Sequence, residues 1–171
     1  FTASPQLSPA DVGAAASLGY QAIINNRPDG EGDDQPSSAE IEAAARAHGL
    51  DYRYIPAIGG RISDDDIASF QAALDEVTGP VLAYCRTGTR SATLWALSEA
   101  RHLSADALIK AAGDAGYDLS GLRARMDSRL AARAQPGGSE AAPAPERKFD
   151  VVVVGGGAGG ISAAASLLNR R

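Results

Sequence analysis

The sequence predicts an α/β fold in which a central, mainly parallel sheet is flanked by helices. Apolar segments of strand length lie at residues 20–25, 51–57 and 80–84, and segments of helical pattern separate them. Parallel strands need long crossover connections, so this alternation favours a parallel sheet with helices on its faces. The 171 residues suffice for one domain with a sizeable core and a shorter additional segment.

The predicted helices carry their own start signals. Ser37 and Glu40 have the spacing of a capping box, and Gly49 is a natural stop for the helix that follows them. Ser63 can cap the next helix, whose first turn is acidic, as the helix dipole favours. The predicted helices cover residues 37–48, 63–78, 89–100 and two further segments that begin at 104 and near 118 and extend to 134.

Composition and charge exclude several classes of protein. The net charge is −5, with 21 acidic and 16 basic residues, which argues against nucleic acid as a partner. One cysteine allows no intramolecular disulfide, and two isolated histidines predict no metal site. No apolar run approaches the roughly 18 residues of a membrane span, so we expect a cytoplasmic protein. The chain opens at Phe1 rather than Met, which leaves a removed leader open.

The third predicted strand runs directly into Cys85, the predicted catalytic nucleophile. Ligands of parallel sheets bind at the carboxyl ends of the strands. Free N–H groups at the start of the following helix favour an anion, and therefore the reactive thiolate. Arg86 and Arg90 add positive charge, and we predict that both act with Cys85 in catalysis. Gly88 lets the chain turn tightly and approach a substrate.

Further polar groups near this loop are predicted to bind the substrate together with Gly88. Thr87, Thr89 and Ser91 offer hydroxyl groups, and Ser91 could donate a hydrogen bond to the thiolate. Arg27, in the loop after the first predicted strand, could bind an anion, and Asp29 could orient an arginine.

Plainer interpretations of these residues stay open. Residues 28–30, Pro-Asp-Gly, are also residue types that favour an ordinary turn. Cys85 could be a buried, inert core cysteine, and the loop 85–90 could bind phosphate without catalysing a reaction.

The residues of the loop also carry a family resemblance. The segment 84–91, Tyr-Cys-Arg-Thr-Gly-Thr-Arg-Ser, resembles the active loop of rhodanese-type sulfurtransferases, which reads Cys-Arg-x-Gly-x-Arg/Thr. The surrounding chain resembles the bacterial family named after beta-lactamase hydrolase-like proteins, whose domain has the dual-specificity phosphatase fold. Segments 25–31, 54–56 and 115–119 carry this second resemblance, which covers about residues 1–134.

The loop departs from the cysteine phosphatase pattern, His-Cys-x5-Arg, in three ways. Only four residues separate Cys85 from Arg90, and Tyr84 replaces the preceding histidine. Gly59 and Gly60 occupy the region where the resemblance implies a general-acid aspartate. Asp29 or Asp64 could replace that acid, and this stays open.

We therefore predict a sulfurtransferase that forms a persulfide on Cys85. Its partners would be a small anionic sulfur donor and a thiol acceptor. A phosphatase that forms a cysteinyl-phosphate and acts on a phosphoester is the alternative. A non-catalytic persulfide or anion sensor is a third possibility.

A second domain is predicted to begin near the C-terminus. Residues 135–147 form a Pro-, Gly- and Ala-rich linker between a domain at 1–134 and a segment at 148–171. In that segment Gly155, Gly157 and Gly160 form Gly-x-Gly-x-x-Gly between a strand pattern and an Ala-rich helix. The plainer alternative is a strand and helix that pack on the first domain.

The segment from residue 149 to 168 resembles the start of flavin-dependent, pyridine-nucleotide-disulfide-type oxidoreductases, including the sulfide:quinone group. The resemblance implies FAD, or NAD(P), in a bifunctional complete chain, whereas residues 1–134 are predicted to need no cofactor. It also implies that the complete protein could lie at the periphery of the inner membrane through its oxidoreductase part.

Overall fold

The computed structural model describes residues 1–133 and 152–153. Its centre is a five-stranded sheet in the order β3-β2-β4-β1-β5, in which all the strand pairs are parallel. This confirms the predicted α/β class with a parallel sheet. The strands are β1 (Thr2–Ser4), β2 (Ala22–Asn25), β3 (Asp51–Tyr54), β4 (Val81–Tyr84) and β5 (Val152–Val153).

The register of the strands brings their carboxyl ends to one edge of the sheet. Tyr84 at the end of β4 lies opposite Ser4 of β1 and Asn25 of β2, and Asn25 lies opposite Tyr54 of β3. The loops that leave these four strands therefore start side by side. Cys85 is the first residue of one of them.

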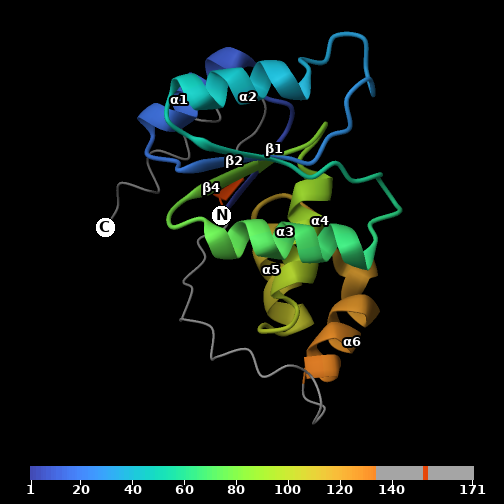
Figure 1. The fold of residues 1–171 in the computed structure, drawn as a ribbon. Helices are drawn as coiled ribbons and strands as arrows, with labels where there is room; N and C mark the ends of the chain where they lie inside the picture. Colours follow the sequence, from blue (N-terminus) through green and yellow to red (C-terminus); the bar gives the residue numbers. More distant parts are fainter. Residues whose placement is uncertain (134–151, 154–171) are drawn as a thin grey trace.

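Helices cover both faces of the sheet (Figure 1). α1 and α2 lie on one face, and α3, α4, α5 and α6 lie on the other. The helices are α1 (Pro9–Ser17), α2 (Ser38–Ala47), α3 (Asp64–Glu76), α4 (Thr89–Glu99), α5 (Ala105–Asp114) and α6 (Arg123–Arg133), and a 3₁₀ turn, η1 (Ser120–Leu122), precedes α6.

Alternation along the central strands divides the core between these two layers. Ile23 and Leu82 pack with buried residues of α1 and α2, whereas Ile24 and Ala83 pack with α3, α4, α5 and α6. Successive side chains of a strand point to opposite faces, so a strand covered on both sides is apolar throughout. β2 and β4 are fully buried and have the central positions in the sheet.

The structure confirms the predicted helix caps. Ser37 and Glu40 form a reciprocal capping box at the start of α2, and Ser63 forms another with Asp66 at the start of α3. No described helix is long and apolar enough to cross a membrane.

Two elements at the N-terminus were not predicted. β1 has only three residues, too few to show a strand pattern. α1 is short and rich in alanine, but Ser8 and Asp11 form a capping box that could have revealed it. β1 matters for the site because it pairs with β4 and extends the edge that holds Cys85.

The segment 152–153 pairs in parallel with β1, at the end of the same sheet. The predicted linker and the motif of Gly155, Gly157 and Gly160 lie outside the described residues. A separate C-terminal domain and its FAD site therefore stay predictions.

Candidate active site

Cys85 lies at the carboxyl edge of the sheet, directly after β4. Its N–H donates to the carbonyl of Ser4 at 3.2 Å, which continues the pairing of β4 with β1. The side chain is buried, with 1% of the residue exposed, and Sγ accepts a hydrogen bond from the N–H of Gly88 at 3.1 Å. The sulfur therefore faces a polar backbone group at the turn of the loop, unlike an inert core cysteine.

The turn that follows Cys85 leads into the N-terminus of α4. Gly88 is the N-cap residue, with φ +90°, and no side chain caps this helix. The N–H of Thr89 reaches only Oγ1 of Thr87, at 3.5 Å, so α4 starts without the capping box of α2 and α3. Uncapped N–H groups and the helix dipole favour negative charge at this position.

Tyr117 packs against the loop at Thr87 and Gly88. Its hydroxyl donates to the carbonyl of Thr87 at 3.3 Å, and a Cβ on Gly88 would lie 1.8 Å from Oη of Tyr117. Burial, and secondarily the negative charge of Cys85, raise the pKa of Tyr117 to about 12. The phenol therefore stays protonated at neutral pH. Tyr117 was not predicted as a site residue, although the resemblance includes the segment 115–119.

Arg90 points into the site and is held by two partners. Nη1 donates to the carbonyl of Ala57 at 2.8 Å, and Nη2 pairs with Oε2 of Glu31 at 2.7 Å. Only 12% of its side chain is exposed. Burial opposes the charged form of Arg90, but Glu31 and Cys85 outweigh it and raise the pKa of the guanidinium. Arg90 is the arginine beside the sulfur.

Arg86 lies differently from Arg90. It is exposed, and its side chain forms no hydrogen bond or ion pair with the described residues. The structure thus separates the two predicted catalytic arginines into one half-buried beside Cys85 and one at the surface. Their positions in the sequence could not distinguish them.

Glu31 links Arg90 to a second arginine and is a site residue that sequence reasoning missed. Its Oε2 accepts from Arg27 Nε at 2.9 Å as well as from Arg90. Arg27 is 7% exposed, and its Nη1 also donates to Oε1 of Gln6 at 2.9 Å. Arg27 therefore orients the carboxylate that orients Arg90, and its guanidinium already has two partners.

Asp29 does not orient an arginine, so this prediction is wrong. Its Oδ1 accepts from the N–H of Ser38 at 2.7 Å, and its own N–H donates to the hydroxyl of Tyr54 at 3.0 Å. Asp29 thus fixes the start of α2 and the end of β3. Glu31, two residues later in the same loop, has the role that was predicted for Asp29.

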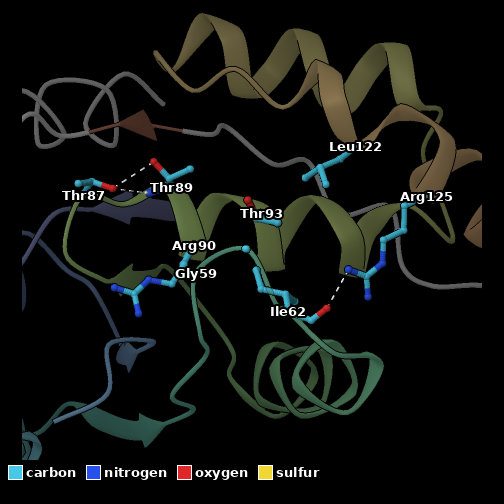
Figure 2. Close-up of a pocket in the computed structure, with 9 residues that line it drawn as sticks. Gly59, Ile62, Thr87, Thr89, Arg90, Thr93, Leu122 and Arg125 are labelled. Carbon is cyan, nitrogen blue, oxygen red and sulfur yellow. Dashed lines mark hydrogen bonds between the residues drawn. The ribbon is translucent and has the colours of Figure 1, made fainter. Parts of the chain in front are cut away.

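The hydroxyl residues of the loop divide into two groups. Ser91 is buried and donates to Oδ1 of Asn26 at 2.8 Å, so the predicted hydrogen bond to the thiolate is not formed. Thr87 and Thr89 are exposed, and their hydroxyls lie 3.1 Å apart (Figure 2). These two threonines can meet a ligand, whereas Ser91 ties α4 to the end of β2.

A cleft of about 370 Å³ adjoins the loop (Figure 2). Residues from the reactive loop, α4, the segment after β3, η1 and α6 form its walls. They are Gly59, Gly60, Ile62, Thr87, Thr89, Arg90, Thr93, Leu122 and Arg125.

The positions considered for a general acid hold either a glycine or an aspartate that has other hydrogen-bond partners. Gly59 and Gly60 line the cleft without any acidic group. Asp64 accepts from Arg125 and from Arg129, each at 3.0 Å, and Asp29 accepts from the N–H of Ser38 at the start of α2. Within the described residues, no group of three His, Cys, Asp or Glu could hold a metal ion.

Tyr84 stands where cysteine phosphatases have a histidine. It is buried with the residues of the α1 and α2 side, on the face of the sheet opposite α4. Burial, together with the neighbouring Tyr52, raises the pKa of its hydroxyl. Tyr84 therefore belongs to the hydrophobic core between the sheet and the α1 and α2 layer.

Comparison with known proteins matches this arrangement to a family. The model of the family described as "Beta-lactamase hydrolase-like protein, phosphatase-like domain" matches residues 1–102. The chain belongs to this family.

Two Beta-lactamase hydrolase-like proteins illustrate the relationship within the family. The one from Agrobacterium fabrum is 45% identical over 91 residues, which are 53% of this chain and 21% of that protein. The one from Xylella fastidiosa strain Temecula1 is 49% identical over 84 residues, which are 49% of this chain and 20% of that protein. The matched part thus spans about a fifth of the length of these curated relatives.

Solved structures share the fold of the phosphatase-like domain. A Neisseria meningitidis Z2491 protein described as a "putative phosphatase" is 36% identical, with a TM-score of 0.67 over 75% of this chain and 92% of that one. A Shewanella putrefaciens CN-32 protein with the same description is 20% identical, with a TM-score of 0.59 over 77% of this chain and 87% of that one. The second likeness concerns the fold alone.

Proposed function

We propose that this phosphatase-like domain transfers sulfur through a persulfide on Cys85. The observation that carries the proposal is the tight loop. Only four residues separate Cys85 from Arg90, the Gly88 amide is already on the sulfur, and Tyr117 closes the turn. A single sulfur atom on Cys85 needs less room than a phosphoryl group with three outer oxygens.

The transfer has two steps that need no external oxidant or reductant. The Cys85 thiolate attacks the outer sulfur of thiosulfate, an S–S bond forms on Cys85, and sulfite leaves with the electron pair of the broken bond. An acceptor thiolate or cyanide then attacks the outer sulfur of the persulfide. The product is the acceptor's persulfide, or thiocyanate, and the Cys85 thiolate is restored.

The described residues have separate roles in these steps. The amide of Gly88 and the N-terminus of α4 stabilise negative charge on Cys85 and on the outer sulfur. Arg90, held by Glu31, attracts the anionic donor. No leaving group needs a proton, because sulfite leaves as a stable anion. The lack of a free aspartate beside the loop, among the residues that the structure describes, is therefore no obstacle.

A phosphatase is the second candidate, and the comparisons favour it. The family carries a phosphatase-like description, and the Neisseria neighbour was described in the same terms at 36% identity. In this reaction Cys85 would form a cysteinyl-phosphate, and a general acid would protonate the leaving alcohol. Such acid catalysis contributes about 10²–10⁴-fold, and neither Asp29 nor Asp64 contacts the loop in a way that supplies it.

Turnover by the purified chain with thiosulfate and cyanide tests the proposal. We expect thiocyanate formation, and a mass increase of about 32 Da on Cys85 after thiosulfate alone, as for one persulfide sulfur. Cys85→Ser should lose both. If p-nitrophenyl phosphate is hydrolysed instead, with the same dependence on Cys85, the phosphatase is correct. A stoichiometric sulfur adduct without turnover would indicate a sensor.

We also propose that residues 148–171 begin a flavin-dependent oxidoreductase in the complete protein, because they combine the glycine motif with the resemblance to that class of enzymes. An oxidoreductase that joined sulfide to a thiol as a persulfide would pass the two electrons to its flavin, and that persulfide would supply the donor to Cys85. The test is the absorption spectrum of the complete gene product after purification. A flavin spectrum is expected, and its absence with FAD supplied would overturn this part of the proposal.

A further inference from the structure

The cleft beside the loop is larger than a thiosulfate or phosphate ion needs. Its volume of about 370 Å³ lies within the range of sites for small organic ligands, about 300–1,000 Å³. Thr87, Thr89 and Arg90 belong both to the reactive loop region and to its walls. A ligand in the cleft would therefore have one end near Cys85.

The walls of the cleft combine positive charge with an apolar surface. Of its nine lining residues two are arginines and none is acidic. Figure 2 shows Arg90 and Arg125 toward opposite ends, with Ile62 and Leu122 at the Arg125 end. Thr93 adds a hydroxyl one helical turn beyond Arg90.

Arg125 is fixed at its end of the cleft. Nη1 donates to the carbonyl of Ile62 at 2.8 Å, and Nη2 pairs with Oδ1 of Asp64 at 3.0 Å (Figure 2). About a third of its side chain, 35%, stays exposed. Asp64 also pairs with Arg129, so one carboxylate is shared by two guanidinium groups and positive charge remains in excess within this cluster.

We propose that this cleft binds the sulfur acceptor, and that the acceptor is a thiol of short-peptide size with a carboxylate. The thiol end would lie at Cys85 and Arg90, the apolar stem against Ile62 and Leu122, and the carboxylate on Arg125. This inference rests on the proposed sulfur transfer. In the second step the acceptor enters as a thiolate, forms an S–S bond with the outer sulfur, and leaves as its persulfide while Cys85 regains its thiolate.

A comparison of KM and turnover for three acceptors tests this assignment. The probes are glutathione, its diethyl ester, which lacks free carboxylates, and cyanide, which is too small to reach Arg125. We expect glutathione to have a KM roughly tenfold or more below that of the ester, because a guanidinium–carboxylate pair is a strong, charge-assisted contact. In Arg125→Gln this preference should disappear, and the ratio of glutathione to cyanide turnover should fall by a similar factor.

Arg129→Gln is the matched control. Arg129 shares Asp64 with Arg125 and also donates to the carbonyl of Leu97, but it does not line the cleft. Its removal should leave the preference for glutathione unchanged. An equal effect of both substitutions, or no preference of the unmodified protein for glutathione over its ester, would overturn the assignment of the cleft.

Calorimetric binding of S-methylglutathione, which cannot accept sulfur, separates this inference from the proposed function. One outcome is that S-methylglutathione binds, that Arg125→Gln weakens this binding, and that the unmodified protein forms no thiocyanate. This outcome would retain the cleft as a carboxylate site and overturn sulfur transfer. Turnover with cyanide but no binding of S-methylglutathione would retain sulfur transfer and overturn the cleft site.

Discussion

Glu31 and Arg90 are 59 positions apart in the sequence, yet Oε2 of Glu31 accepts from Nη2 of Arg90 at 2.7 Å. The contact joins the loop after β2 to the first turn of α4. Because Arg27 donates to the same oxygen, the carboxylate is held from both sides. The orientation of Arg90 toward Cys85 thus depends on a loop that contributes no atom to the reaction itself.

Loss of the Glu31 carboxylate should slow the reaction even though the nucleophile, Cys85, is still present. Glu31→Gln should lower kcat/KM for thiosulfate by about 10- to 100-fold, because one charge-assisted hydrogen bond contributes about 1.5–3 kcal/mol. Glu31→Asp should recover part of that loss. Asp29→Asn is the control, since Asn keeps the oxygen that accepts from Ser38, and it should stay within about twofold. Equal losses in the Glu31 and Asp29 variants would argue against a specific role of Glu31.

The same carboxylate predicts a pH dependence of stability. Its pKa lies below the ordinary value, chiefly because of the hydrogen bond from Arg90 and secondarily because of Arg27, although burial acts in the opposite direction. A lowered carboxyl pKa stabilises the fold above the ordinary pKa, and this contribution is lost as pH falls through the folded-state pKa.

Urea unfolding of the native chain and of Glu31→Gln at several pH values measures this contribution. The native chain should have the higher midpoint at neutral pH. The two midpoints should converge as pH falls from the ordinary carboxyl pKa of about 4.3 through the lower folded-state pKa of Glu31. A difference that persists unchanged at low pH would mean that charge on Glu31 does not contribute.

The class of the fold and the position of Cys85 could be predicted because local chemistry determines both. β2 and β4 are apolar strands at the centre of the sheet, and Cys85 follows β4 with the glycine and the arginine of its loop close in sequence. The parts that could not be predicted depend on register and on contacts between distant segments. β1 is too short for a pattern, and the choice between Asp29 and Glu31 as partner of an arginine depends on the path of the loop.

Gly88 should tolerate no side chain, for two separable reasons. Its φ of +90° costs an L-residue about 1–2 kcal/mol, and a Cβ would lie 1.8 Å from the hydroxyl oxygen of Tyr117. Overpacking typically adds about 1–3 kcal/mol. We expect Gly88→Ala to lower the free energy of unfolding by about 2–5 kcal/mol, measured in urea.

Tyr117→Phe tests which reason dominates. In this background a Cβ on Gly88 no longer meets the hydroxyl, although the ring carbon that bears it stays 2.8 Å away. Gly88→Ala should therefore cost less free energy in the Tyr117→Phe protein than in the native chain. An identical cost in both would show that the hydroxyl contact does not contribute, and would leave backbone conformation and the remaining contacts as the cause.

The two arginines of the loop should respond to substitution to very different extents. Arg90→Lys loses the fixed geometry by which one guanidinium reaches Ala57 and Glu31, so kcat/KM for thiosulfate should fall by about 100-fold or more, as when several charge-assisted hydrogen bonds are removed. Arg86→Ala removes an exposed side chain and should change kcat/KM by less than about threefold, with an effect that salt suppresses. The measurement is the initial rate against thiosulfate concentration at low and high ionic strength. A larger loss in Arg86→Ala than in Arg90→Lys would show that the exposed arginine closes over the bound donor, and would reverse the roles of the two side chains.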